Sequence, residues 1–318
     1  MATMSEKIAV IIDEEMIGLH AGGVACLFDY GEGPVSLRVG GREWLYRAPR
    51  PTFWRATTDN DRGNGFSVRS AQWVGAELFS AVKGLPKLQV DGKPVAIPYT
   101  PADGSTGGKL EASDVSLSYV FVTPTNPSTS VDVCYRFDAT SRLSVRVRYH
   151  GQPGLPQLPA FGLRMVMPTP ATGFAYFGLP GETYPDRLGS GRRQLVEVEG
   201  MPVTPYLVPQ ECGMRTDVDW VRITRETTLN NADASRAPYS LTVASVDRPL
   251  SFTCLPYTPL ELENADHQEE LPPVRRTVLT VYGAVRGVGG IDSWGADVGE
   301  RYAISGEQDL EFGFAVTL

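Results

Sequence analysis

Histidine is scarce in this 318-residue sequence, and so are the local signatures of common enzymes. The three histidines, His20, His150 and His267, do not have metal-ligand spacing, so we expect no metal site on this chain. There is no G-x-S-x-G elbow, P-loop or Rossmann fingerprint. A pair of glycosidase carboxylates has no local signature and stays possible, but the βαβ alternation of a barrel that would hold it is absent.

Cysteine, long apolar runs and blocks of like charge are also rare. The cysteines lie far apart without a C-x-x-C motif, and we expect four buried free thiols of a reducing compartment: Cys26, Cys134, Cys212 and Cys254. No apolar stretch has the length of a signal peptide core or a membrane span, so we expect a cytoplasmic protein without a membrane partner. The net charge of −8 is spread along the chain, and we expect no nucleic-acid partner.

The sequence is rich in period-two alternation of apolar and polar residues, which is typical of half-buried antiparallel strands. Gly40 and Gly41 predict a hairpin turn. Only residues 67–82 have a helical period. On the alternating strands we expect arginines and acids to pair across neighbours. The clearest strands are expected at residues 115–121, 131–137, 143–149, 241–243, 278–282 and 310–318, which makes the protein all-β.

Residues 49–65 form a polar stretch that we expect to be a long loop. Its motif residues are Arg55, Asp59, Asn60 and Asp61, which are of types that cap, turn and accept hydrogen bonds. One interpretation is that they only satisfy the loop's own amides, and another is a functional loop. Ligation of a hard cation is a third, which one cluster without further ligands supports weakly.

Two later segments, residues 178–189 and 202–213, read as loops. They offer six polar groups for a polar site or a subunit contact: Glu182, Tyr184, Asp186, Arg187, Gln210 and Glu211. We expect Asp186 and Arg187 to lock their own loop through side-chain to backbone bonds.

A glycine-rich run, residues 286–295, holds a single large aromatic, Trp294. Glycines let a backbone take unusual conformations and approach another surface closely, so the run predicts a shaped loop. An indole on such a loop offers a flat apolar face and one N–H group, which suits sugar recognition. From residue type alone we favour the alternative, a core tryptophan at a tight turn.

Four segments, in order, resemble motifs of the last domain of the lactose-cleaving β-galactosidases of glycoside hydrolase family 2. They are residues 51–63 (Pro-Thr-Phe-Trp-Arg-Ala-Thr-Thr-Asp-Asn-Asp-Arg-Gly), 181–187, 205–213 and 287–294. The length fits the small subunit of the heterodimeric enzymes. The resemblance implies one large antiparallel β-sandwich domain over residues 1–318, a supersandwich of the galactose mutarotase type.

The resemblance also implies roles for individual residues. Trp294, with Asp292 and Ser293, matches the substrate-binding tryptophan loop. A loop that swings near the site matches Gly63, Asn64, Gly65 and Phe66 and continues to Ser70. The catalytic glutamates and the magnesium and sodium ligands belong to the large subunit, so this chain carries no catalytic residue and no cofactor. We expect a galactoside substrate, a large-subunit partner and no activity of the chain alone.

Two other functions stay open. Kinship with the mutarotases allows a stand-alone aldose 1-epimerase, with His150 or His267 as acid and a glutamate as base; the candidate bases are Glu182, Glu211 and Glu263. A carbohydrate-binding module would bind sugar by itself. The sequence also leaves open the order of the hetero-oligomer, the preferred galactoside, the balance of hydrolysis and transglycosylation, and whether the chain is a natural subunit or part of a longer enzyme.

Overall fold

A computed structural model describes residues 7–99 and 107–317 of the chain. Within this part the strands form three sheets, and their pairings are antiparallel. The first sheet has the order β10-β1-β2-β3-β4-β5. Its strands are β1 (Ile8–Ile12), β2 (Met16–Ala21), β3 (Val24–Asp29), β4 (Gly33–Val39), β5 (Arg42–Glu43) and β10 (Gly108–Ala112).

The largest sheet has the order β16-β15-β18-β19-β22-β13-β12-β11-β8-β9, with β7 paired to β11. Its strands are β7 (Ala81–Val82), β8 (Lys87–Val90), β9 (Lys93–Val95), β11 (Asp114–Val122), β12 (Ser130–Asp138), β13 (Leu143–Tyr149), β15 (Gly173–Gly178), β16 (Gln194–Glu199), β18 (Trp220–Arg225), β19 (Tyr239–Ser245) and β22 (Leu310–Thr317). The third sheet has the order β17-β20-β21-β14-β6, from β17 (Arg215–Val218), β20 (Leu250–Leu255), β21 (Thr277–Val285), β14 (Ala160–Met167) and β6 (Arg50–Thr52).

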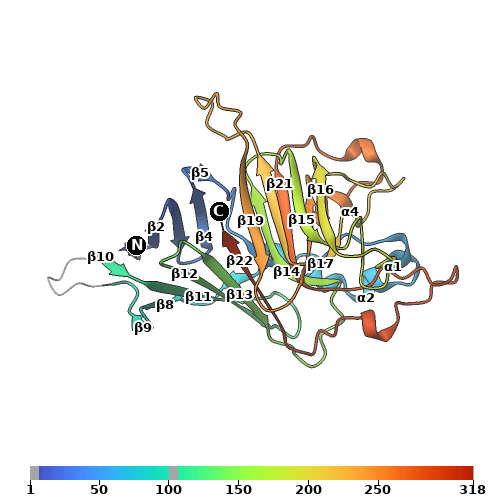
Figure 1. Cartoon of the computed structure of the whole chain (residues 1–318). Coiled ribbons are helices and arrows are strands. Elements are labelled where there is room, and N and C mark those ends of the chain that lie inside the picture. Colours follow the sequence, from blue (N-terminus) through green and yellow to red (C-terminus); the bar gives the residue numbers. More distant parts are fainter. Residues whose placement is uncertain (1–6, 100–106, 318) are drawn as a thin grey trace.

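The largest sheet forms the common layer of the molecule. One half of it, β11 to β13, packs against the first sheet, where the ring centroids of Phe28 and Tyr135 are 5.5 Å apart. The other half packs against the third sheet, where Phe174 and Phe252 are 5.7 Å apart. Strand β22 lies between β13 and β19 and joins the two halves (Figure 1). One hydrophobic cluster contains residues of all three sheets.

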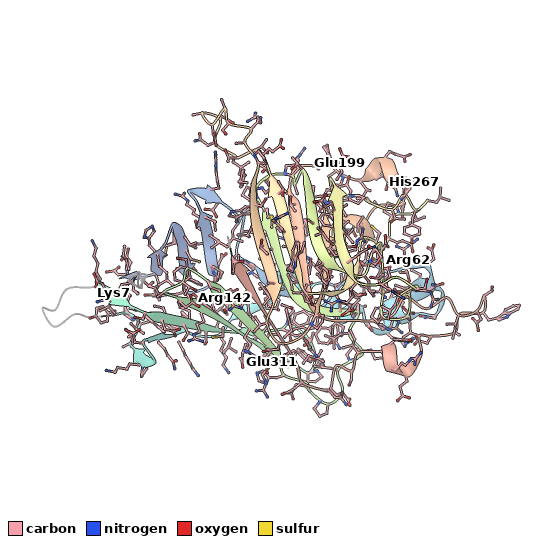
Figure 2. The ribbon with its side chains drawn as sticks, viewed as in Figure 1. Lys7, Arg62, Arg142, Glu199, His267 and Glu311 are labelled. Carbon is pink, nitrogen blue, oxygen red and sulfur yellow. The ribbon has the colours of Figure 1, made fainter. Side chains whose placement is uncertain are left out.

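The expectation of an all-β protein of antiparallel strands is confirmed. The hairpin at Gly40–Gly41 joins β4 to β5, with Val39 opposite Arg42. Charged residues pair across the outer face of the largest sheet, as expected; for example, Arg146 pairs at 3.0 Å with Glu311, which is labelled in Figure 2. The final strand is confirmed as far as Thr317, and Leu318 lies outside the described residues. One domain over residues 1–318 stays a prediction.

Two expectations about local structure were wrong. The stretch 49–65 is not one long loop, because it contains β6 and a helix, α1 (Asp59–Gly63). Residues 67–82 are not one helix. They belong to four short elements: α2 (Phe66–Arg69), the 3-10 turn η1 (Ala71–Trp73), α3 (Ala76–Phe79) and β7. The apolar period there was misleading, since Val68 and Leu78 are exposed whereas Phe66 and Trp73 are buried.

The remaining helical elements are α4 (Pro259–Glu263), η2 (Gln268–Glu270) and η3 (Glu300–Tyr302). No helix in the described part of the chain is long and apolar enough to cross a membrane. The four cysteines are free thiols, as expected, although Cys134 is only half-buried. Every residue of β14 is buried, because helices and loops cover the outer face of the third sheet and the largest sheet covers its inner face. These covering segments carry the candidate site.

Candidate functional site

The candidate site is built on residues 287–297, named here the Trp294 loop, which leaves the end of β21 and projects beyond α1 in dark red in Figure 1. Trp294 is 92% exposed. The expectation from residue type, a core tryptophan, was therefore wrong. Ile291 on the same loop is also exposed. A large aromatic with almost no cover is unusual for its residue type, which makes Trp294 a candidate for contact with another surface or a ligand.

The tip of the loop is held by its own aspartate. One carboxylate oxygen of Asp292 accepts hydrogen bonds from the backbone N–H groups of Trp294 at 2.9 Å and Ala296 at 3.1 Å. These bonds lower the pKa of Asp292, because they stabilise its charged form. Gly295, at φ +85°, lies against the end of α1, where an added Cβ would be 3.5 Å from the carbonyl oxygen of Gly63. Ser293 is exposed beside the indole.

The start of the loop is fixed by residues from the segment 178–189. Asp186 accepts the backbone N–H of Val288 at 3.0 Å on one oxygen and that of Gly289 at 2.9 Å on the other. The guanidinium of Arg187 donates to the carbonyl oxygen of Gly289. Within its own segment, Arg187 donates to the backbone carbonyl oxygen of Asp186 at 2.8 Å, as expected, and the backbones of Tyr184 and Arg187 form a small bridge. The side chains of Asp186 and Arg187 also bond to the Trp294 loop, which the sequence did not predict.

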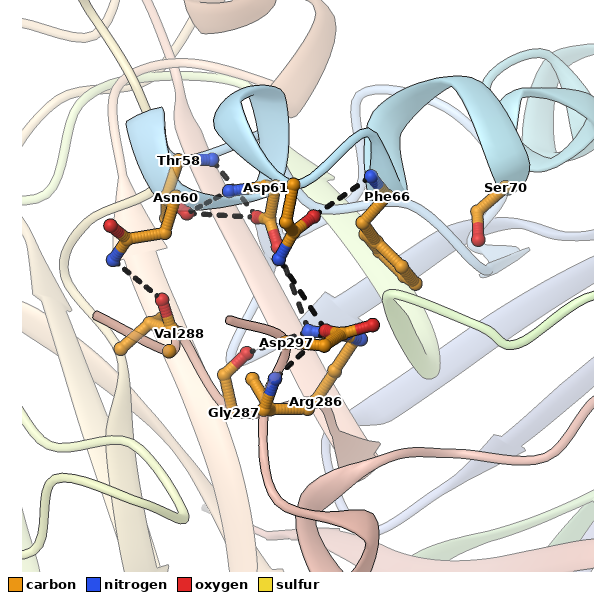
Figure 3. A network of polar contacts seen from close by, with 12 residues as sticks. Thr58, Asn60, Asp61, Phe66, Ser70, Arg286, Gly287, Val288 and Asp297 are labelled. Carbon is orange, nitrogen blue, oxygen red and sulfur yellow. Dashed lines mark hydrogen bonds and ion pairs between the residues drawn. The ribbon is translucent and has the colours of Figure 1, made fainter. Parts of the chain in front are cut away.

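Helix α1 supplies the second attachment of the loop. Thr58 caps the helix, and its capping box is completed by Asp61. Asp61 is buried and pairs with the fully buried Arg55 at 2.7 Å, and Arg55 also donates to the carbonyl oxygen of Gly287 at 3.0 Å. Asn60 donates to the carbonyl oxygen of Val288 at 2.9 Å (Figure 3). A buried arginine needs such partners, because an unpaired buried charge costs several kcal/mol.

A second buried arginine holds the other end of the loop. Arg286 pairs with Asp297 and lies with its guanidinium 3.8 Å from the ring centroid of Phe66. Asp297, which is labelled with Arg286 in Figure 3, also pairs with Arg69 at 2.9 Å and accepts a bond from Asn64 at 3.4 Å. Burial is the largest single influence and raises the pKa of Asp297, but the bonds from Arg286 and the backbone of Val298, together with the charges of Arg286 and Arg69, lower this pKa below its ordinary value. Both ends of the Trp294 loop are therefore fixed by charged groups.

The expected motif residues Asp59, Asn60 and Asp61 each bond to a different partner. Asp59 exchanges two hydrogen bonds with Gln210, at 3.0 and 3.1 Å, while Asn60 and Asp61 bond to the partners given above. The idea that they satisfy only their own loop's amides was incomplete, because two of the three bond to distant segments. Of the expected mobile residues, Gly63 is exposed, but Phe66 is buried under Arg286.

The nearby carboxylates are already used by the structure. Asp186 and Asp292 accept backbone N–H groups, and Asp61 and Asp297 pair with arginines. The acid–base pairs considered for an epimerase are not formed among the described residues, since His150 pairs with Asp132 and His267 with Glu270. The four carboxylates around the Trp294 loop are therefore engaged in building the loop.

One glutamate beneath the site is unusual. Glu211 is buried, and within the described part of the chain its Oε1 atom has no hydrogen-bond partner. Burial raises the pKa of Glu211 to about 8; the charge of Arg55 opposes this shift and that of Glu182 adds to it. Sequence reasoning gave Glu211 as a polar candidate but could not show that it is buried. It missed the roles of Arg286 and Asp297 altogether, although a charged residue at the end of an apolar strand is a signal for a buried ion pair.

Comparison with known proteins gives a consistent result. Residues 20–317 match the family model for the beta galactosidase small chain. The chain is 49% identical over 318 residues, and over the full length of both proteins, to the beta-galactosidase small subunit of Latilactobacillus sakei. It is 34% identical over 316 residues to the beta-galactosidase of Halalkalibacterium halodurans, covering 96% of this chain and 28% of that one. With the beta-galactosidase of Lactobacillus delbrueckii subsp. bulgaricus the identity is 31%, with 92% and 26% covered.

The chain thus spans about a quarter of the length of these two longer relatives. Among solved structures, a putative aldose 1-epimerase from Escherichia coli K12 has a TM-score of 0.43 at 11% identity, covering 97% of this chain and 98% of that one. A likeness of this size supports no conclusion about function.

Replacing Asp186 by asparagine tests the attachment of the Trp294 loop. Asparagine has one acceptor where aspartate has two, so one of the N–H groups of Val288 and Gly289 loses its partner, at a cost of about 1–3 kcal/mol. We expect at least fivefold faster amide hydrogen exchange at these two residues. Asp309→Asn, which removes an acceptor from Gly151 in the segment after β13, serves as the control and should leave the loop unchanged. Unchanged amide hydrogen exchange at Val288 and Gly289 in Asp186→Asn would contradict the attachment of the Trp294 loop by Asp186.

The buried Glu211 predicts a pH dependence of stability. Its folded-state pKa of about 8 lies above the ordinary value of 4.5, so the folded state keeps a proton that the unfolded state releases. The free energy of unfolding should therefore fall as pH rises from about 5 to about 8 and level off above that. Each pKa unit is worth about 1.4 kcal/mol. In urea unfolding experiments, the free energy of unfolding of Glu211→Gln should not show this decrease with rising pH. A pH dependence parallel to that of the wild type would contradict the assignment.

Proposed function

This chain belongs to the family of beta-galactosidase small chains, and from that premise we propose that it completes the active site of a large catalytic subunit by placing Trp294 against the bound sugar. The observation that carries the proposal is an indole that is 92% exposed on a loop whose two ends are fixed by buried charges. The substrates are terminal β-D-galactosides such as lactose.

Stacking explains why the residue is a tryptophan. The face of an indole is apolar and carries partial negative charge, so it attracts the polarised C–H groups on one side of a sugar ring. The gain depends on covering the ring from water. Trp294 alone offers only one face of such a site, so a partner must supply the opposite wall. Asp292 and Ser293 act beside it, Asp292 by holding the turn and Ser293 as an exposed hydroxyl near the sugar.

We propose that the chemistry lies on the large subunit. A retaining or inverting glycosidase needs two carboxyl groups facing the scissile bond. The four carboxylates that hold the Trp294 loop are already bound to arginines or backbone N–H groups. The longer relatives carry about three quarters of their length outside the part that this chain matches, which gives room for the catalytic domain. The catalytic glutamates and the magnesium and sodium sites are assigned to that part.

The corner between α1 and α2, from Gly63 to Phe66, is proposed as the moving element near the site. Gly65 has φ +76°, a conformation that glycine adopts easily, and Gly63 lies next to Gly295 of the Trp294 loop. Phe66 serves as its fixed end, because it is buried and covered by Arg286. A shift of Gly63 and Asn64 would change the space in front of the indole. Four free cysteines support a cytoplasmic, reducing location for the assembly.

Reconstitution tests the proposal. The purified chain, the large subunit and their mixture are each assayed with a chromogenic β-galactoside and for interconversion of galactose anomers. We expect full hydrolysis only in the mixture, and no acceleration of anomer exchange by the chain alone. Hydrolysis by the isolated chain at a rate comparable to the mixture would overturn the assignment of catalysis to the large subunit. Rapid exchange of galactose anomers by the isolated chain would favour an epimerase.

Trp294→Ala tests the stacking role. Losing a stacked indole is worth about 1–3 kcal/mol, so the KM for lactose should rise roughly 5- to 150-fold. Glucose should also become a weaker acceptor, because fewer contacts remain on that side. Assembly with the large subunit should persist, as judged by sizing. Leu207→Ala, which removes another highly exposed apolar side chain, is the control and should leave KM within twofold. Loss of assembly in Trp294→Ala would show that the indole is an interface anchor instead.

A further inference from the structure

A pocket of about 340 Å³ opens between α3 and α4, away from the Trp294 loop, and is named here the α3–α4 pocket. Its floor is the outer face of β14, where Arg164 and Val166 line it. Arg164 is buried and pairs with Glu77 of α3. Proline side chains of the segments before α4 and after η2 form much of the wall, which makes the pocket a preformed shape.

The pocket has an excess of positive charge. Four arginines and two glutamates line it, a formal balance of +2 in a chain with a net charge of −8. Both glutamates already have partners, because Glu77 pairs with Arg164 and Glu261 caps α4 at Thr258. Arg275 is exposed at the rim. This arrangement favours an occupant that carries a carboxylate.

Exposed apolar side chains lie beside these charges. Leu78 lines the pocket and is 52% exposed, and Phe79, which follows it on α3, is 72% exposed. Tyr46 is also partly exposed, and the guanidinium of Arg276 lies 3.4 Å from its ring centroid. Apolar groups gathered around a concave site with a polar rim are typical of an interaction surface.

The pocket is connected to the candidate site through α4. The N-terminal end of this helix lines the pocket, while Glu263 at its C-terminal end accepts hydrogen bonds from the backbone N–H and the hydroxyl of Thr57, both at 2.6 Å. Thr57 directly precedes the cap of α1, and α1 holds the Trp294 loop through Asn60. A single large body that covers Trp294 and extends across α1 and α4 therefore reaches the pocket.

We propose that the α3–α4 pocket is a second docking point for the large subunit, which inserts an apolar side chain flanked by a carboxylate. The proposal rests on the proposed function. A large partner is favoured as occupant because the longer relatives contain about three times as much chain outside the matched part, and because the lining charge suits an acidic segment.

Charge and shape are tested by two variants with matched controls. Arg275→Glu reverses a rim charge, and Arg142→Glu makes the same change on the turn before β13 in the other half of the molecule (Figure 2). Leu78→Asp places a charge at the pocket, and Leu85→Asp does so at a similarly exposed leucine before β8. The dissociation constant of each full chain for the large subunit is measured by calorimetry, after circular dichroism confirms folding.

We expect the two pocket variants to bind at least tenfold more weakly than the wild type and the two controls to stay within twofold. If the pocket variants also stay within twofold while the wild type binds and restores activity, the docking point is overturned and the proposed function stands. If the wild type neither binds nor restores activity, both are overturned. A dimer of the isolated chain that Arg275→Glu abolishes would overturn the proposal in favour of a second copy as occupant.

Discussion

The structure depends on two buried arginines that fix a loop at both of its ends. Arg55 and Arg286 are fully buried, and both lie near the carboxylate of Asp61, at 2.7 and 3.6 Å. Removing one member would leave a buried charge without a partner, so the cluster is stable only as a unit. Because Arg55 and Arg286 also bond to Gly287 and Asp297, the cluster fixes where the loop begins and ends. The tip is then free to project without losing its position.

This arrangement makes sense of an exposed indole. A tryptophan in water gains nothing for the isolated fold, since its apolar surface is left hydrated. Held on a fixed base, it loses little conformational freedom when a second surface closes over it, which favours binding. The exposed indole therefore contributes favourable free energy only in an assembly, where a second surface covers it. The same logic applies to the carboxylates around it, which are used to build the loop.

The sequence predicted the all-β class and most long strands, because alternation over seven to nine residues leaves few other folds for those segments. The sequence did not predict the segments whose structure depends on burial against distant parts of the chain. The short helices of residues 66–79 follow the burial of Phe66 and Trp73, which no local pattern reveals. The exposure of Trp294 contradicts the usual behaviour of its residue type, and only the resemblance to a family pointed to it. Asp186 was named as a polar candidate, but its partners lie 102 and 103 residues away and were not predictable.

The central claim is that Trp294 is open to water in the isolated chain and covered by sugar and partner in the working enzyme. The other four tryptophans are buried or partly buried, so 5-fluorotryptophan in this chain alone gives one resonance of an exposed indole, which Trp294→Phe identifies. The ¹⁹F shift of that resonance in H₂O and D₂O measures its contact with solvent. The account predicts a solvent isotope shift in the isolated chain that disappears in the complex with the large subunit and a bound galactoside. An unchanged isotope shift in the saturated, active complex would contradict it.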